Sequence, residues 1–143
     1  MKVFIDTNIL ISAALSNEGI PYQAFVKAVS YPNHGMVCEQ NIDEIRRIFN
    51  RKFPNKIQAL EAFLSLALLT LEVVSVPVEE YDLEKKIRDV NDRPILRSAI
   101  HAGADILVTG DKDFLESGIH NPQVMTAKDF IRTEENEYGS CGL

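Results

Sequence analysis

The chain has 143 residues, of which 45% are hydrophobic, and a net charge of −6 from 15 Lys and Arg against 21 Asp and Glu. This length predicts one domain that buries roughly two thirds of its unfolded surface. The acidic balance argues against nonspecific electrostatic binding of nucleic acid but is compatible with an enzyme that meets phosphates through bound cations. Without a transmembrane run or signal-peptide pattern, we expect a cytoplasmic protein with no membrane partner.

Five short apolar runs are predicted as strands, and amphipathic helical patterns separate them. The strands are expected at Lys2–Ile5, Met36–Cys38, Glu72–Val76, Ile106–Thr109 and Gln123–Thr126, and the clearest helices at Pro21–Val29, Ile42–Phe49, Ile57–Leu71 and Pro94–Ala102. Alternating strands and helices are typical of an α/β domain with a central parallel five-stranded sheet covered on both faces. We expect this domain to span residues 1–133 and the polar tail, residues 134–143, to fray.

Acidic side chains follow the predicted strands or open the predicted helices. Asp6 comes directly after the first strand, and Asp111 and Asp113 come directly after the fourth. Ligands of open parallel sheets bind outside the carboxyl ends of the strands, so two neighbouring strands would bring these carboxylates together. Clustered carboxylates repel one another and call for a cation, and hard oxygen ligands suit Mg²⁺ or Mn²⁺ better than Zn²⁺.

Each acidic residue also has a structural interpretation. Asp6 and Asp92 stand where a helix N-cap is expected, Asp92 directly before Arg93 and Pro94. Glu44 borders the apolar stripe of its helix, and Asp111 and Asp113 are ordinary turn formers. A capping carboxylate can still present its second oxygen to a metal, so the two interpretations are compatible. Asp89 is expected to be a loop residue or an acceptor behind the metal ligands.

The whole pattern resembles a PIN domain, the nuclease fold of VapC-type toxins and of several RNA-processing factors. The resemblance covers nearly the whole chain and is carried by four segments: Phe4 to Leu10, Glu44 in its helix, Asp89 to Leu96, and Gly103 to Phe114 with its Thr-Gly-Asp-Lys-Asp-Phe sequence. The chain looks most like the subgroup of toxin components of toxin–antitoxin systems. The resemblance implies a PIN-like three-layer α/β/α sandwich and a metal-dependent endoribonuclease, with an antitoxin as a protein partner.

The resemblance also implies which residues act. The catalytic set is Asp6, Glu44, Asp92 and Asp111, and the metal ligands are Asp6, Asp92 and Asp111 with Asp113 as a further candidate. Thr7 and Asn8 are expected to position Asp6, and Thr109 to lie near the metal or a phosphate. Asn91 and Arg93 flank Asp92 where members of the subgroup often carry more acid.

Two further features point to macromolecular partners. Arg46, Arg47, Arg51, Lys52 and Lys112 are candidate RNA contacts, although a basic helix face is more often simply solvated. The helix at Ile57–Leu71 is apolar on more than one face, so Leu66 and Leu69 either enlarge the core or offer a surface to a second copy or an antitoxin. Cys38 and Cys141 match no metal spacing and are expected to be free thiols.

Two other function classes remain open on the sequence. One is a catalytically silent PIN-fold module that binds RNA or protein, against which the intact acidic set argues. The other is an aspartyl-phosphate phosphatase, suggested by an aspartate at a strand end. Such an enzyme needs a second aspartate two residues after the first, and this chain has Asn8 there.

Overall fold

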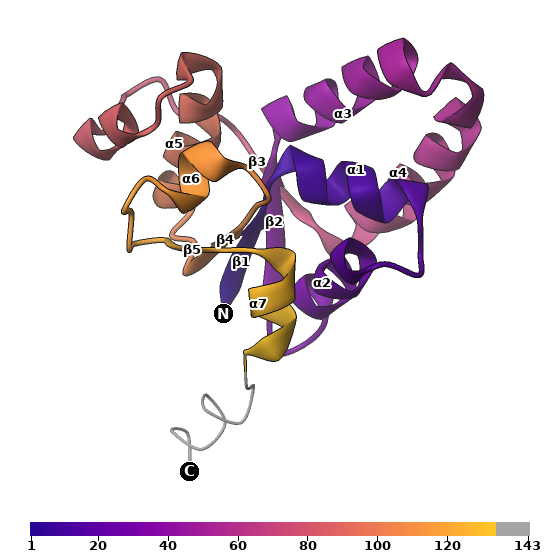
Figure 1. Cartoon of the computed structure of the whole chain (residues 1–143), viewed down its shortest axis with the longest axis horizontal. Coiled ribbons are helices and arrows are strands. Elements are labelled where there is room, and N and C mark those ends of the chain that lie inside the picture. The colour runs from indigo at the N-terminus through magenta and orange to yellow at the C-terminus, as the bar shows by residue number, and fades with distance from the viewer. Residues whose placement is uncertain (134–143) are drawn as a thin grey trace.

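The computed structural model describes residues 1–133, which form a five-stranded parallel sheet with helices on both faces (Figure 1). The strands are β1 (Lys2–Ile5), β2 (His34–Cys38), β3 (Glu72–Val74), β4 (Ile106–Val108) and β5 (Gln123–Met125). The helices are α1 (Thr7–Leu15), α2 (Ile20–Val29), α3 (Glu39–Lys52), α4 (Ile57–Thr70), α5 (Arg93–His101), α6 (Lys112–Leu115) and α7 (Ala127–Arg132), with short 3₁₀ turns η1 (Pro54–Lys56), η2 (Asp82–Lys86) and η3 (Val90–Asp92). The expected fraying of the tail and the free thiol of Cys141 lie outside the described residues.

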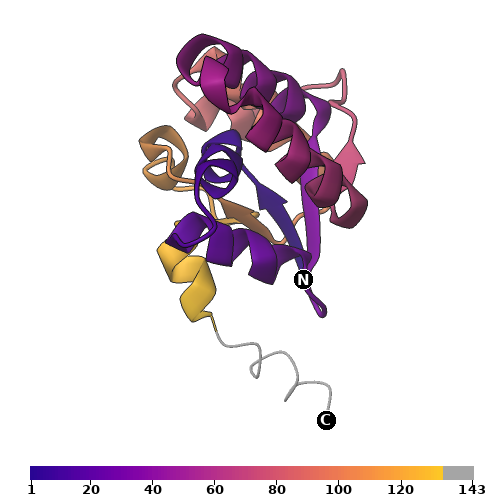
Figure 2. The same cartoon turned by 90° about the vertical axis from the view of Figure 1, so that its right-hand side faces the viewer.

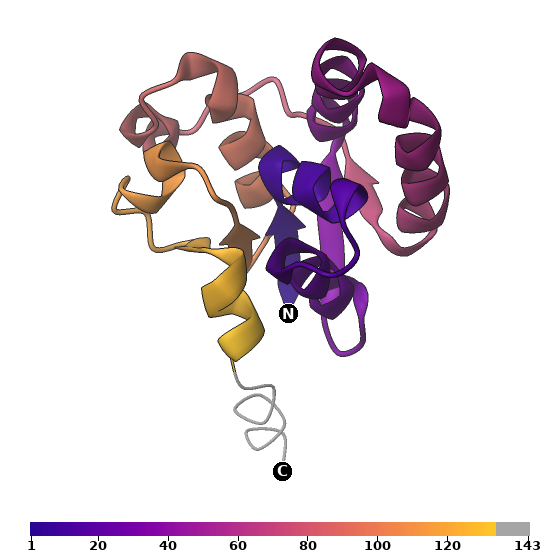
Figure 3. The ribbon, with the colours of Figure 1, turned by 45° about the vertical axis from the view of Figure 1, so that its right-hand side comes forward.

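Alternating side chains of the strands separate two hydrophobic cores, as a sheet covered on both faces requires. On β1, Val3 and Ile5 join the core beneath α1, α2, α3, α4 and α7, whereas Phe4 joins the core beneath α5 and α6. Figures 1 and 3 show these two groups of helices on opposite sides of the sheet. The predicted three-layer α/β/α sandwich is therefore confirmed.

Two element boundaries differ from the predicted ones because a polar residue caps a helix there, while β2 begins two residues earlier and β3 ends two residues earlier than predicted. Helix α3 begins at Glu39 rather than at Ile42 because Cys38 and Asn41 form a reciprocal capping box at its start. The predicted last strand loses Thr126, whose side chain caps α7 by accepting a bond from the backbone N–H of Asp129. Apolar spacing alone does not register such caps, so it places helix starts too late and strand ends too far along.

The strand order β3-β2-β1-β4-β5 places a topological switch point between β1 and β4. Successive connections run one way from β1 through β2 to β3, whereas β4 and β5 lie on the other side of β1. The backbone N–H of Asp6 bonds to the carbonyl of Val108 at 3.0 Å, so the carboxyl ends of β1 and β4 meet. A crevice at this position is the ligand site of open parallel sheets.

Helix α4 pairs with α3 at one edge of the molecule (Figure 2) and carries apolar side chains on its outer face. Leu60, Leu64 and Ala67 are buried, whereas Leu66 and Leu69 are 71% and 82% exposed. The two leucines therefore do not enlarge the core. Within residues 1–133, no helix combines the length and the apolar character that a membrane crossing requires.

Candidate functional site

Three carboxylates gather at the carboxyl edge of the sheet. Asp92 ends η3, Asp111 precedes α6, and Asp113 lies in its first turn. One carboxylate oxygen from each lies within 4.8 Å of the other two, a spacing that one cation can bridge. We call Asp92, Asp111 and Asp113 the acidic cluster.

Asp6 lies behind the cluster rather than within it. Its side chain is only 6% exposed, and one carboxylate oxygen accepts the backbone N–H of Thr7 at 2.8 Å as the cap of α1. The other accepts the hydroxyl proton of buried Thr109 at 2.7 Å. Burial raises the pKa of Asp6 to about 6, although these hydrogen bonds oppose the shift, and the charges of Glu44 and Asp111 add to it. A cation bound nearby would stabilise the charged form of this buried carboxylate, which neighbouring acidic residues destabilise.

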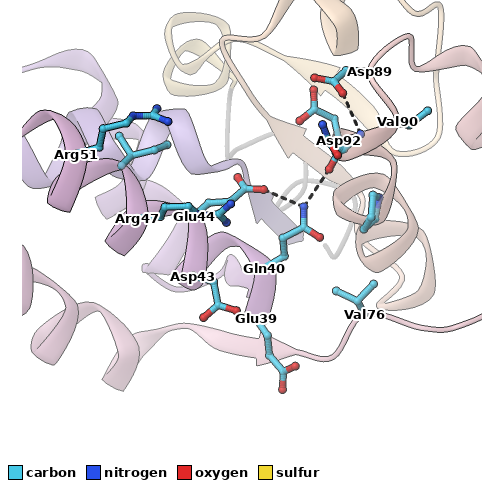
Figure 4. A pocket seen from close by; sticks show the side chains of 13 residues that line it. Glu39, Gln40, Asp43, Glu44, Arg47, Arg51, Val76, Asp89, Val90 and Asp92 are labelled. Atoms are coloured by element: carbon cyan, nitrogen blue, oxygen red, sulfur yellow. Dashed lines mark hydrogen bonds between the residues drawn. The ribbon is translucent and has the colours of Figure 1, made fainter.

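Glu44 is held by a hydrogen-bond chain that begins in the start of α3. Asn41 donates to the hydroxyl of Thr7 at 2.8 Å, and that hydroxyl donates to Glu44 at 2.9 Å. Gln40, one helical turn before Glu44, donates to its other oxygen at 2.8 Å and to the carbonyl of Asn91 at 3.0 Å (Figure 4). Gln40 therefore ties α3 to the turn that carries Asp92.

Asp92 occupies the N-cap position of α5, as predicted, but its side chain makes no capping hydrogen bond. The prediction that it acts as a cap is wrong, and its backbone is helical rather than in the extended conformation typical of a capping residue. Asp89 instead caps η3 by accepting the N–H of Asn91 at 2.9 Å. Burial, followed by the close approach of Asp111 and then the charges of Asp6 and Asp89, raises the pKa of Asp92 to about 7.

Hydrogen bonds to the side chains of Thr109 and Asn8 hold the turn after β4. The Thr109 hydroxyl accepts the backbone N–H of Asp111 at 3.0 Å, and the side-chain oxygen Oδ1 of Asn8 accepts the backbone N–H of Gly110 at 3.2 Å. Asn8, which was expected to position Asp6, thus holds the turn before Asp111. One Asp111 carboxylate oxygen accepts the backbone N–H of Asp113 at 2.9 Å, which sets the orientation of the Asp111 carboxylate.

A large hollow of about 1030 Å³ opens beside the cluster, between α3 and the segment from η3 to the start of α5 (Figure 4). Asp92 and Glu44 line it, together with Arg47 and Arg51 from successive turns of α3. The other predicted RNA contacts lie elsewhere. Arg46 pairs with Glu61 of α4 at 3.1 Å, and Lys52 and Lys112 do not line this hollow.

Sequence reasoning missed Gln40, Asn41 and Arg88 as residues of this site. Asn41 had a local signal, since an amide three residues after Cys38 can close a capping box. Gln40 had a local signal only for its contact with Glu44, one helical turn away. Its contact with Asn91 and that of Arg88 with Asp113 span 51 and 25 residues and have no local signal.

The donor set fits a hard divalent cation. Every candidate ligand is a carboxylate, and neither histidine nor cysteine belongs to the cluster found among residues 1–133. Oxygen-only sites favour Mg²⁺ or Mn²⁺ over Zn²⁺. Burial is the largest cause of the raised pKa values of Asp6 and Asp92, and the charges of neighbouring carboxylates add to both shifts.

Comparisons with known proteins agree with this architecture. Residues 2–113 match the PIN domain family, whereas no curated protein sequence matches the chain. The VapBC2 complex of Rickettsia felis, bound to a promoter DNA fragment, superposes with a TM-score of 0.67 at 19% identity, covering 88% of this chain and 98% of that one. A toxin–antitoxin complex from Klebsiella pneumoniae gives 0.63 at 21% identity, with coverages of 87% and 97%. The sarcin–ricin loop cleaving toxin VapC20 of Mycobacterium tuberculosis gives 0.57 at 19% identity, with coverages of 82% and 95%.

Proposed function

Because this chain belongs to the PIN domain family, we propose that it is an endoribonuclease that hydrolyses RNA with Mg²⁺ or Mn²⁺ at the acidic cluster. The observation that carries the proposal is the convergence of Asp92, Asp111 and Asp113 beside buried Asp6, at the switch point of the sheet. A bound divalent ion would lower the pKa of water and neutralise charge on the scissile phosphate.

The side chains divide into ligands and residues that orient them. We assign Asp92, Asp111 and Asp113 as the carboxylates nearest the ion. Asp6 is a fourth candidate ligand, and Thr109 fixes it relative to Asp111 through one hydroxyl group.

Glu44 has a separate role in the proposal. Thr7 and Gln40 donate to its two oxygens and so hold the carboxylate at the wall of the large hollow. A carboxylate at this position suits the acceptor of a proton from the attacking water, or a ligand that reaches the ion through water.

RNA is proposed to enter through the large hollow. Arg47 and Arg51 lie one helical turn apart on its wall, and guanidinium groups bind phosphate in bidentate fashion. They would lead the strand past Glu44 toward Asp92. Acidic side chains also line this hollow, so the two arginines and a bound divalent ion together would offset their charge near the reacting groups.

We extend the proposal to a role as the toxin of a toxin–antitoxin pair, because two of the similar structures are of that kind. Exposed Leu66 and Leu69 on α4 offer an apolar surface for the antitoxin or for a second copy of the chain. The cytoplasm, where RNA is available, is the proposed location.

A circular single-stranded RNA tests the endonuclease directly, because it offers no end to an exonuclease. We expect the wild type to linearise it with Mg²⁺ or Mn²⁺ and not in chelator. Asp111→Asn should abolish cleavage, whereas Asp43→Asn, which changes an exposed acid of the large hollow outside the acidic cluster, should not. RNA binding without cleavage in any of the metals would instead support the silent-module alternative.

A further inference from the structure

A second hollow, of about 350 Å³, borders the acidic cluster through Asp113. Its other lining residues include Lys86 and Arg88, from the segment that joins β3 to α5. The large hollow reaches the same cluster through Asp92. The two hollows therefore border the cluster at different carboxylates, whose ligand oxygens lie within 4.8 Å of each other, and each hollow carries cationic side chains beside its acidic ones.

The backbone around Arg88 is firmly held. Ile87 is fully buried in the core beneath α5, and its carbonyl accepts a bond from Arg93 at 3.0 Å. Further back, buried Glu84 pairs with Arg97 at 2.9 Å. Arg88 is therefore presented at a fixed place beside the cluster although its own side chain is 72% exposed.

Arg88 contacts the cluster itself. Its guanidinium bonds to one Asp113 oxygen at 2.8 Å and 2.9 Å, from two nitrogen atoms. A pair this exposed contributes little to folding, so stability does not account for the position of Arg88. Its planar guanidinium can donate two hydrogen bonds to phosphate oxygens, and Lys86 adds a second positive charge in the same hollow.

We propose that Lys86 and Arg88 bind a phosphate of the RNA that neighbours the scissile one, on the side opposite Arg47 and Arg51. The inference rests on the proposed function and specifies the path of its substrate. A strand then crosses the cluster with a cationic contact on each side and needs no free end. Arg88 exchanges its contact with Asp113 for the phosphate, while Asp113 turns to the cation.

Binding to a fluorescent single-stranded RNA, measured by anisotropy in the Asp111→Asn background, tests the inference apart from cleavage. Asparagine keeps an oxygen that can accept the N–H of Asp113, so the turn is preserved. Adding Arg88→Gln should weaken binding about fivefold, and the slope of log affinity against log salt should fall by about 0.7, the value for one phosphate contact on a single strand. Lys85→Gln is the control, because Lys85 is a neighbouring cation that pairs with Asp82 and lines neither hollow.

A third comparison separates direct binding from neutralisation of Asp113. In an Asp111→Asn, Asp113→Asn background Arg88 has no acidic partner, and Arg88→Gln should still weaken binding about fivefold. The inference is overturned if Arg88→Gln has no effect on binding in the double-asparagine background, or if Lys85→Gln weakens binding as much as Arg88→Gln does. It is also overturned if the Asp111→Asn variant does not bind RNA. The proposed function fails separately if the wild type cleaves no RNA although Arg88→Gln still weakens RNA binding.

Discussion

The hydroxyl group of Thr109 joins Asp6 to Asp111, because it donates to the Asp6 carboxylate at 2.7 Å and accepts the backbone N–H of Asp111 at 3.0 Å. One buried oxygen thus couples the ends of β1 and β4 across the switch point. Its removal should affect the fold and the site together.

Thr109→Val should lower the free energy of unfolding by about 1–3 kcal/mol, since it leaves the N–H of Asp111 and one carboxylate oxygen of Asp6 without the Thr109 hydroxyl as a partner. Thr109→Ser keeps the hydroxyl group and should retain most of the stability and the activity. Because the Thr109 hydrogen bond lowers the pKa of Asp6, the valine variant should also need a higher pH for metal binding. Urea unfolding and metal titrations from pH 6 to pH 8 measure both effects. Equal behaviour of the two variants would contradict this role.

The raised pKa values of Asp6 and Asp92 make the metal-free protein less stable as the pH rises. Between the ordinary aspartate pKa of 3.8 and the raised values of about 6 and about 7, the folded state holds protons that the unfolded state has lost. Stability from these groups is therefore greatest below pH 3.8 and falls until about pH 7, by up to about 3 kcal/mol for Asp6.

Asp6→Asn should remove part of that fall, so in chelator at pH 7.5 the variant should melt at the same temperature as the wild type or higher. Asparagine can still cap α1 with its carbonyl oxygen. Thermal melts in chelator at pH 5 and pH 7.5 provide the measurement, with Asp43→Asn as a control for the loss of one exposed acid. A variant that melts clearly lower at pH 7.5 would show that Asp6 serves mainly the fold.

Mg²⁺ or Mn²⁺ should raise the melting temperature by binding only the folded state, and Zn²⁺ should not be required. Binding should be weaker at pH 6 than at pH 8, because the ion must displace protons held by Asp6 and Asp92. Calorimetry in two buffers with different ionisation enthalpies counts those protons. Binding that Asp111→Asn leaves unchanged would place the ion elsewhere.

The exposed pair Leu66 and Leu69 should mediate association. A Leu66→Glu, Leu69→Glu double variant should remain folded, because both side chains are mostly exposed, but should lose any dimer or antitoxin complex seen by light scattering. Val78→Glu, at a residue that is 93% exposed outside α4, is the matched control. If the double variant unfolds instead, the two leucines serve the stability of the fold and the prediction is contradicted.

The site residues that follow the ends of strands could be predicted from the sequence, whereas those that act through contacts between distant residues could not. Asp6 and Asp111 could be placed together because each follows an apolar run, and parallel strands align their carboxyl ends. The family resemblance was confirmed by the match over residues 2–113. The contacts of Arg88 with Asp113 and of Gln40 with Asn91 were not predictable, since no local pattern records which turns the fold brings together.

Exposure of side chains was equally hard to infer. Leu64 and Leu66 belong to the same apolar helical segment and cannot be distinguished from the sequence, yet Leu64 is buried and Leu66 lies on the outer face of α4. The same limit applies to the basic residues of α3, where Arg47 lines the large hollow and neighbouring Arg46 binds Glu61. When a helix is apolar or basic on several faces, its sequence pattern does not indicate which face packs against the rest of the protein.

The chemistry of the cut ends tests the central claim most directly. A cation held by the acidic cluster would supply an activated water as the nucleophile in place of the 2′-hydroxyl, so cleavage with Mn²⁺ should leave a 5′-phosphate and a 3′-hydroxyl. Mass spectrometry of the fragments from a single-stranded RNA, with Mn²⁺ and with chelator, provides the measurement. These ends, together with loss of cleavage in chelator and in Asp111→Asn, are the predicted result. Ends with 2′,3′-cyclic phosphates, or undiminished cleavage in chelator, would contradict hydrolysis at the acidic cluster.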